Sequence, residues 1–172
     1  MAGELIIDLV RHMKARNRLK WTGEDDERPL TKLGLRQAEM HAGVMASGER
    51  IEAVYSSPAV RCRQTIEPLA ERLGFIPRIE PLLAETRLLS SLPIGAENPL
   101  LSRLREAHPD GGRVVACGHG VTIPAFLESL NAEATIAVPG VLKGFGGWYR
   151  VRVTGDSVRI ERVGAPDGFP VD

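Results

Sequence analysis

Cysteine is scarce in this sequence, and its placement excludes several classes of protein. Only two cysteines, Cys62 and Cys117, occur among 172 residues, and they form no CxxC pair. A disulfide scaffold or a zinc site needs more cysteines or closer spacing, so we expect reduced thiols, with a single buried bridge as the alternative. Neither residue begins the C-x5-R loop of a cysteine phosphatase, because Pro68 and Ile123 occupy the sixth position after them.

An excess of charge of either sign is also absent. The sequence holds 22 Lys and Arg against 22 Asp and Glu, which gives a formal net charge of zero. No global field therefore draws the protein to a nucleic acid polymer or to an anionic membrane surface. We expect neither among its partners, and any anion that it binds must be captured by a local arrangement of side chains.

No apolar run is long enough to span a bilayer, and no basic segment followed by an apolar one opens the sequence. We therefore expect a cytoplasmic protein. Internal repeats and low-complexity tracts are absent as well. Because 172 residues with 43% hydrophobic content can bury one core, the sequence predicts a single domain over residues 1–172.

The sequence lacks the common motifs for nucleotide and metal binding. No GxxxxGK[ST] segment occurs, no HExxH segment occurs, and Gly144, Gly146 and Gly147 do not form a GxGxxG fingerprint. These absences argue against a P-loop enzyme, a metal-dependent hydrolase and a dinucleotide-binding protein. We expect no cofactor and no metal.

The segments that are present alternate between strand-like and helix-like patterns. Residues 5–10, LIIDLV, are nearly continuous in apolar side chains, which is typical of a buried parallel strand. Residues 52–55 and 113–117 predict two further strands, and residues 148–153 and 157–163 predict a hairpin around Gly155. This order predicts an α/β fold, a three-layer sandwich with a mostly parallel central sheet flanked by helices.

Three helices are predicted between these strands, in addition to one that begins near Ala96. The first runs over residues 31–45, is capped by Thr31 and ends before Gly48. The second opens at Pro58 and ends at Gly74, and the third covers residues 121–130. Residues 82–99 predict a loop, and a helix begun near Ala96 ends by His108. The apolar faces predicted for the first two helices are Leu33, Leu35, Ala38 and Val44, and Val60, Ile66, Leu69, Ala70 and Leu73.

Cationic side chains follow the predicted strands at their carboxyl ends. Arg11 and His12 come directly after the first strand, His119 follows the strand 113–117, and Arg61 lies in the first turn of a helix. Ligands of open α/β sheets bind beyond the carboxyl ends of the strands. A helix N-terminus and a guanidinium both favour a phosphate group, so these residues predict a phosphoryl-binding pocket.

The segments LVRHM, SPAVR, LLAET and CGHGVTIP resemble the signature of the histidine phosphatase superfamily, which has a phosphoglycerate mutase-like fold. That signature contains LVRHG, S-P-x-x-R, an L-x-E acid and a second histidine after a late buried strand. The resemblance covers most of the chain. It is greatest to the short SixA-like branch and to the histidine phosphatase domain fused behind some mycobacterial Nudix hydrolases, although these 172 residues contain no Nudix domain.

The resemblance implies a role for each motif residue. His12 is the nucleophile that carries a transient phosphohistidine, and Arg11, Arg61 and His119 bind the phosphoryl oxygens. Glu85 protonates the leaving group and then deprotonates the attacking water; the alternative for Glu85 is a surface carboxylate of a loop. Basic residues proposed for the rim of the substrate site are Lys14, Arg18, Arg28 and Lys143, and the alternative for them is a solvated or ion-paired loop.

One residue departs from the family pattern. Met13 stands where the family usually has glycine, and its side chain must either narrow the pocket or turn outward. The predicted function is a phosphatase for a phosphorylated small molecule or a phosphohistidine protein. The alternatives are a non-catalytic phospholigand-binding or protein-interaction module and a phosphoglycerate mutase-type phosphotransferase, for whose insertions this chain has little room.

Overall fold

The computed structural model of the chain describes residues 3–85, 98–130, 137–139 and 141–171. Residues 86–97, which hold most of the predicted loop and the start of the helix predicted from Ala96, lie outside this range. Six strands form one sheet in the order β3-β2-β4-β1-β5-β6. Their bounds are β1 Leu5–Arg11, β2 Ile51–Ser56, β3 Arg78–Ile79, β4 Gly112–Gly118, β5 Trp148–Thr154 and β6 Ser157–Val163.

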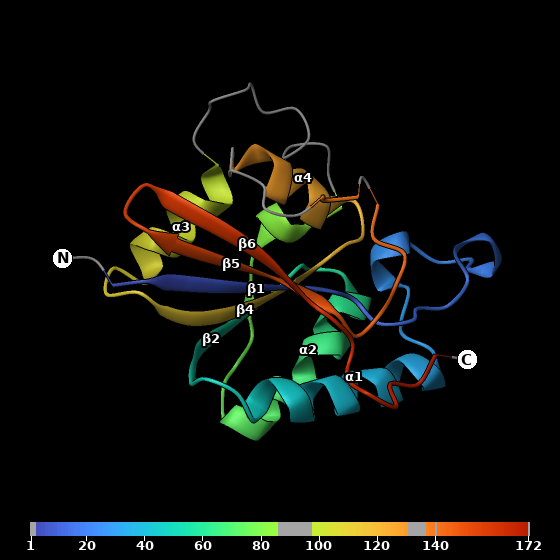
Figure 1. Cartoon of the computed structure of the whole chain (residues 1–172). Coiled ribbons are helices and arrows are strands. Elements are labelled where there is room, and N and C mark those ends of the chain that lie inside the picture. The colour runs from blue at the N-terminus through green and yellow to red at the C-terminus, as the bar shows by residue number, and fades with distance from the viewer. Residues whose placement is uncertain (1–2, 86–97, 131–136, 140, 172) are drawn as a thin grey trace.

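The helices cover both faces of this sheet. Helices α1 (Lys32–Ala46) and α2 (Val60–Leu73) lie on one face, and α3 (Pro99–Ala107) and α4 (Thr122–Ser129) lie on the other (Figure 1). Short 3-10 turns η1 (Arg18–Lys20), η2 (Asp25–Glu27) and η3 (Pro81–Leu83) occur in the connections. The predicted three-layer α/β sandwich is confirmed. Within the described residues, no helix combines the length and the apolar character needed to cross a bilayer.

The parallel strands of the sheet determine where the predicted site residues lie. β1 pairs in parallel with β4, and β2 pairs in parallel with both β4 and β3. β5 runs antiparallel to β1, and the β5–β6 hairpin turns at Gly155, whose φ is 57°. The carboxyl ends of β1, β2 and β4 therefore meet at one edge of the sheet.

Strand β1 is buried on both faces, which explains its nearly continuous apolar sequence. Leu5, Ile7 and Leu9 belong to the core cluster that includes α3 and α4 side chains. Val10 belongs to the cluster formed with α1 and α2. Ile6 and Asp8 are also buried, so the single charged residue of this run needs a partner inside the protein.

Two helix predictions are wrong in detail. The buried side chains of α1 include Gln37, His41 and Met45, whereas Leu35 is 45% exposed and Leu33 and Val44 are only half-buried. Gly34 explains the rotation, because a Cβ there would lie 2.1 Å from the carbonyl oxygen of Lys14, so this stripe of the helix packs against backbone. The second helix begins at Val60 rather than Pro58.

Asp8 is paired with two arginines in the middle of the sheet. Its Oδ2 accepts a hydrogen bond from Nε of Arg113 at 2.7 Å, and its Oδ1 accepts one from Nε of Arg150 at 2.7 Å. Nη1 of Arg113 also donates to the backbone oxygen of Glu49 at 2.6 Å. These contacts compensate the buried charges for lost hydration and join the segment after α1 to the sheet.

Removal of this carboxylate is expected to destabilise the fold strongly. Asp8→Ala leaves Arg113, which is 3% exposed, without a counter-charge, and breaking a buried pair from one side costs about 3–5 kcal/mol. Urea denaturation measures the loss. Glu4→Ala is the matched control, because Glu4 pairs with Arg152 at the surface and such pairs contribute less than about 1 kcal/mol. Equal, small losses for both variants would contradict a stabilising role of the Asp8 cluster.

Candidate active site

The two motif histidines lie at the carboxyl ends of neighbouring parallel strands. Arg11, the last residue of β1, is in register with Gly118, the last residue of β4. The next residues are therefore adjacent: the backbone N–H of His12 donates to the oxygen of Gly118 at 3.0 Å. The rings of His12 and His119 meet edge to face with their centroids 5.5 Å apart.

A cavity of about 370 Å³ opens over these rings. The structure brings most of the predicted site residues into its wall, but Arg61 and Lys143 are not among the lining residues. Hereafter this space is called the phosphoryl cavity. It is lined by Arg11, His12, Lys14, Ala15, Arg18, Arg28, Glu85, His119, Gly120, Val121, Val141 and Phe145.

His12 is held as a neutral imidazole with a free nitrogen. Its Nδ1 lies 2.8 Å from the carbonyl oxygen of Met13, and because a carbonyl can only accept, the proton is on Nδ1 and Nε2 carries a lone pair. Burial lowers the pKa of His12 to about 3 against the hydrogen bond to Met13, and the charges of His119, Arg61 and Arg11 lower it further. This is the protonation state that a nitrogen nucleophile requires.

Met13 does not intrude on the cavity. Its side chain is fully buried in the core cluster between the sheet and helices α1 and α2. Its backbone N–H donates to Oγ1 of Thr65 at 2.9 Å, which fixes the turn after β1. Of the two alternatives for Met13, the side chain turns out of the pocket rather than narrowing it, and it packs in the core on the face of the sheet that α1 and α2 cover.

Arg61 is fully buried and is bound by two carboxylates. Its Nη1 donates to the backbone oxygen of Asp25 at 2.6 Å, and its Nη2 donates to Oδ2 of Asp25 at 3.0 Å and to Oε2 of Glu85 at 3.1 Å. Nη2 also lies 3.3 Å from Nδ1 of His119. Arg61 thus lies directly behind the cavity wall, in contact with two residues that line it.

Asp25 contacts a further two arginines. Its Oδ1 accepts from Nε of Arg28 at 2.9 Å and lies 3.3 Å from Nε of Arg18. Burial opposes ionisation, but the hydrogen bond from Arg28 and the charges of Arg61, Arg28 and Arg18 hold the pKa of Asp25 below its usual range. Arg28 therefore belongs to an ion-paired loop, the alternative that the sequence left open, and also faces the phosphoryl cavity.

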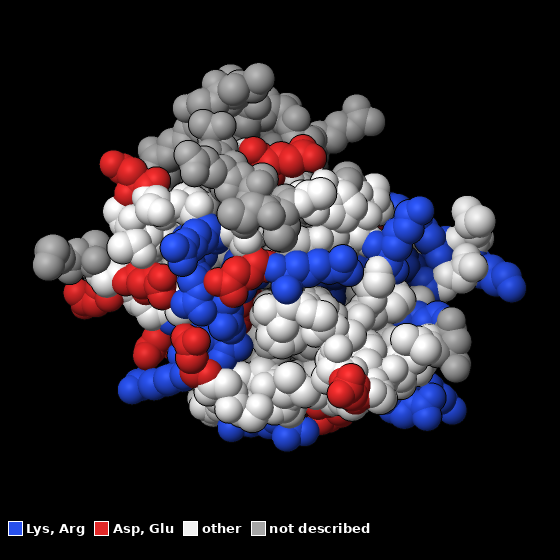
Figure 2. Space-filling view, viewed as in Figure 1, with Lys and Arg blue, Asp and Glu red and all other residues white. Residues whose placement is uncertain are grey.

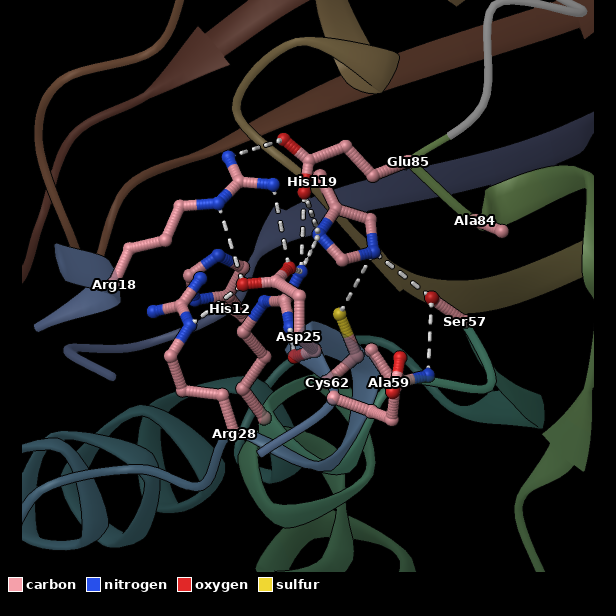
Figure 3. A network of polar contacts seen from close by, with 12 residues as sticks. His12, Arg18, Asp25, Arg28, Ser57, Ala59, Cys62, Ala84, Glu85 and His119 are labelled. Carbon is pink, nitrogen blue, oxygen red and sulfur yellow. Dashed lines mark hydrogen bonds and ion pairs between the residues drawn. The ribbon is translucent and has the colours of Figure 1, made fainter. Parts of the chain in front are cut away.

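The ring of His119 is oriented from both of its nitrogens. Because Arg61 can only donate, Nδ1 accepts and the proton of the neutral ring is on Nε2, which lies 2.9 Å from Oγ of Ser57. Sγ of Cys62 lies 3.6 Å from the same nitrogen. Figure 3 shows His119 between Glu85 on one side and Ser57 and Cys62 on the other.

Comparison of the sequence with known proteins shows the family to which this chain belongs. The model of the histidine phosphatase superfamily (branch 1) matches residues 7–89. The 8-oxo-(d)GTP phosphatase of Mycolicibacterium smegmatis is 34% identical over 162 residues, which are 92% of this chain and 48% of that protein. The chain belongs to the histidine phosphatase superfamily. It spans about half the length of this curated relative.

Solved structures of this superfamily share the fold. The putative phosphohistidine phosphatase SixA from Agrobacterium tumefaciens aligns with a TM-score of 0.67 and 25% identity over 94% of this chain and 99% of that chain. The mycobacterial glucosyl-3-phosphoglycerate phosphatase aligns with a TM-score of 0.69 and 19% identity over 95% of this chain and all of that chain. The likeness to the second protein shows the fold alone. The resemblance to the superfamily that the motifs indicated is confirmed.

Three residues of this histidine phosphatase site were missed or undervalued in the sequence. Ser57 is the serine of the S-P-x-x-R segment and directly follows the carboxyl end of β2. That position could have indicated a residue of the site, because ligands bind at this edge of the sheet. The sequence around Asp25 and Arg28 indicates only a segment that shapes the entrance or an ion-paired loop, and Cys62 gives no signal. The contacts of Asp25 and Cys62 with Arg61 and His119 form only on folding. Cys62 and Cys117 are both free and buried. No cluster of three or more potential metal ligands occurs in the described parts of the chain.

The depressed pKa of His12 has a measurable sign. The folded protein keeps the ring neutral down to about pH 3, whereas the unfolded chain protonates it near pH 6.5. Because only the unfolded chain gains this proton, the free energy of unfolding falls as the pH drops below about 6.5. We expect the ¹⁵N resonances of His12 to stay those of a neutral ring between pH 8 and 4.5, and the stability of His12→Gln to fall less steeply over this range. Protonation of His12 near pH 6.5 would contradict this assignment.

Proposed function

We propose that this chain is a phosphatase that hydrolyses a phosphomonoester or a phosphohistidine through a covalent phosphohistidine on His12. One observation carries the proposal: Nε2 of His12 is unprotonated while the ring is buried in a cavity that Arg11 also lines. An unprotonated nitrogen beside fixed positive charge suits attack on phosphorus, because the cations stabilise the charge on the equatorial oxygens.

In the first step, Nε2 of His12 attacks phosphorus and the bond from phosphorus to the leaving oxygen breaks. Glu85, in its protonated form, gives its proton to that oxygen, so that a neutral alcohol departs. The position of Glu85 in the wall of the phosphoryl cavity, together with His12 and His119, supports this role. Its Oε2 lies 3.8 Å from Nδ1 of His119.

In the second step, a water attacks the phosphohistidine. Glu85, now a carboxylate, accepts a proton from that water, the bond from phosphorus to Nε2 of His12 breaks, and inorganic phosphate leaves. The steps return both residues to their starting protonation states and require no metal or organic cofactor. A substrate with a nitrogen leaving group depends on proton transfer differently, so Glu85 has less influence when the substrate is a phosphohistidine.

Arg61 must change partners for its proposed role in phosphate binding. In the structure, Asp25 and Glu85 occupy its Nη2. A bound phosphoryl group would replace the Glu85 carboxylate on Arg61 and so release Glu85 toward the leaving oxygen. Once off Arg61, the carboxylate takes up a proton, from a monoanionic substrate or from solvent, before it acts as the acid. His119 would then donate from Nδ1 to the phosphoryl group beside Arg61, a role that requires Nδ1 to take up a proton while Nε2 stays bonded to Ser57.

The non-catalytic alternative has lost its main support, since Met13 lies in the core and leaves the phosphoryl cavity open. The similar proteins are named for action on 8-oxo-(d)GTP, phosphohistidine and glucosyl-3-phosphoglycerate. We propose a phosphorylated partner of one of these kinds, either a small molecule or a phosphohistidine protein.

The test is phosphate release from a panel of phosphomonoesters and phosphohistidine peptides in the presence of EDTA. We expect turnover by the wild type and a loss of at least about a thousandfold in kcat for His12→Ala, because the nucleophile is removed. His108→Ala is the matched control, since His108 contacts Tyr55 at a distance from the site. Turnover that persists in His12→Ala, or that EDTA abolishes in the wild type, would contradict the proposal.

A further inference from the structure

A second cavity adjoins the phosphoryl cavity. It has a volume of about 360 Å³ and shares Arg11, Val141 and Phe145 with its neighbour. The remaining wall includes Lys143 and Tyr149, together with Arg162 of strand β6. We call this space the hairpin cavity, because strands β5 and β6 contribute part of its wall.

The hairpin cavity is positively charged. Arg11, Lys143 and Arg162 line it, and no carboxylate does so among the described residues. The side chains of Lys143 and Arg162 take part in no hydrogen bond or ion pair with any described residue. In Figure 2, acidic and basic side chains alternate at the left of the molecule, whereas those in the middle and toward the right are mostly basic.

The opposite flank of the phosphoryl cavity carries the reverse charge. A hollow there shares Arg18 and Glu85 with the phosphoryl cavity and is otherwise lined by Glu24, Asp25, Asp26 and Glu27. The phosphoryl cavity therefore lies between an acidic flank and a basic flank. A leaving group with negative charge would be repelled by the first and attracted by the second.

Arg11 forms the boundary between the phosphoryl and hairpin cavities. Its guanidinium carbon lies 4.6 Å from the centroid of the Phe145 ring, and its Nη1 donates to the oxygen of Gly144 at 3.3 Å. Its Nε is buried and has no hydrogen-bond acceptor in the described structure. One arginine at this boundary can thus contact anionic oxygens while the ring of Phe145 packs against the body of a ligand.

We propose that the hairpin cavity binds a second anionic group of the substrate. The substrate is then an organic phosphate whose leaving group carries a carboxylate or another phosphate, with the reacting phosphoryl group at His12 and the second anion at Lys143 and Arg162. This assignment rests on the proposed phosphatase function, because it describes the far end of the same substrate. It accounts for the unpaired cations on one side of the site and the carboxylates on the other.

The test uses phosphonates, which bind without reacting. Isothermal titration calorimetry measures the binding of arylmethylphosphonates that carry a second anionic group, a carboxylate or a phosphonate, at one of two distances from the first phosphonate. Each is compared with a matched probe in which a primary amide replaces the second anionic group. The wild type is expected to bind at least one probe with a second anionic group about fivefold more tightly than the matched amide, as two partly solvated ion pairs would provide. The double variant Lys143→Gln/Arg162→Gln is expected to lose this preference.

Arg159→Gln is the matched control, because Arg159 lies on β6 in an exposed position and lines neither cavity. It should keep the preference of the wild type. Equal binding of anionic and amide probes by the wild type, or an unchanged preference in the double variant, would overturn the subsite.

A parallel turnover assay separates the two proposals. Hydrolysis of phosphate esters together with equal binding of all phosphonate pairs would reject the subsite and leave the phosphatase function standing. A preference for the probes with a second anionic group that depends on Lys143 and Arg162, without hydrolysis of any ester, would reject the phosphatase function and support an anion-binding role for the hairpin cavity.

Discussion

The buried guanidinium of Arg61 is the interaction on which the rest of the site depends. A fully buried positive charge is costly unless carboxylates and hydrogen-bond acceptors surround it. Here the acceptors come from three separate segments: Asp25 from the loop after β1, Glu85 from the segment after η3, and His119 from the end of β4. The need to neutralise one side chain therefore brings together segments that are far apart in the sequence.

This constraint links stability to chemistry. Asp25 contacts Arg18 and Arg28 as well as Arg61, so one carboxylate holds three cations beside the phosphoryl cavity in the absence of substrate. Without that carboxylate the arginines would repel one another. The same arrangement places negative charge on one flank of the cavity, while Lys143 and Arg162 leave the other flank positive. The direction in which a substrate extends from His12 follows from this asymmetry.

The sequence was sufficient to predict five of the six strands that the structure describes, each to within one residue at either end, because buried strands have recognisable apolar patterns. Strand β3 has only two residues, both exposed, and was not predicted. The sequence also located His12 and His119, since each directly follows a buried strand. The apolar face of α1 could not be predicted, because the approach of Gly34 to the Lys14 backbone decides which side of the helix is buried. Lys143 was predicted at the substrate rim, and it lines the hairpin cavity, which adjoins the phosphoryl cavity.

Contacts between side chains from different segments explain the other differences. In the sequence, Asp25 is one of several charged residues of a loop, and its hydrogen bonds to Arg61 exist only in the folded chain. Met13 departs from the family pattern at a position beside the pocket, but the turn after β1 directs its side chain into the core between the sheet and helices α1 and α2. Both outcomes depend on the path of the backbone beyond a strand end, which residue types alone do not determine.

The central claim is that Nε2 of His12 forms a bond to phosphorus. Rapid quenching of Glu85→Gln with a nitrophenyl phosphate, followed by peptide mass spectrometry under alkaline conditions, tests it most directly. The nitrophenolate leaves without a proton from Glu85, so loss of the proposed base should slow only the hydrolysis of the intermediate. The account predicts a phosphoryl group on His12 that is stable to alkali and labile to acid. Turnover without any phosphorylated His12, or phosphorylation of a different residue, would contradict it.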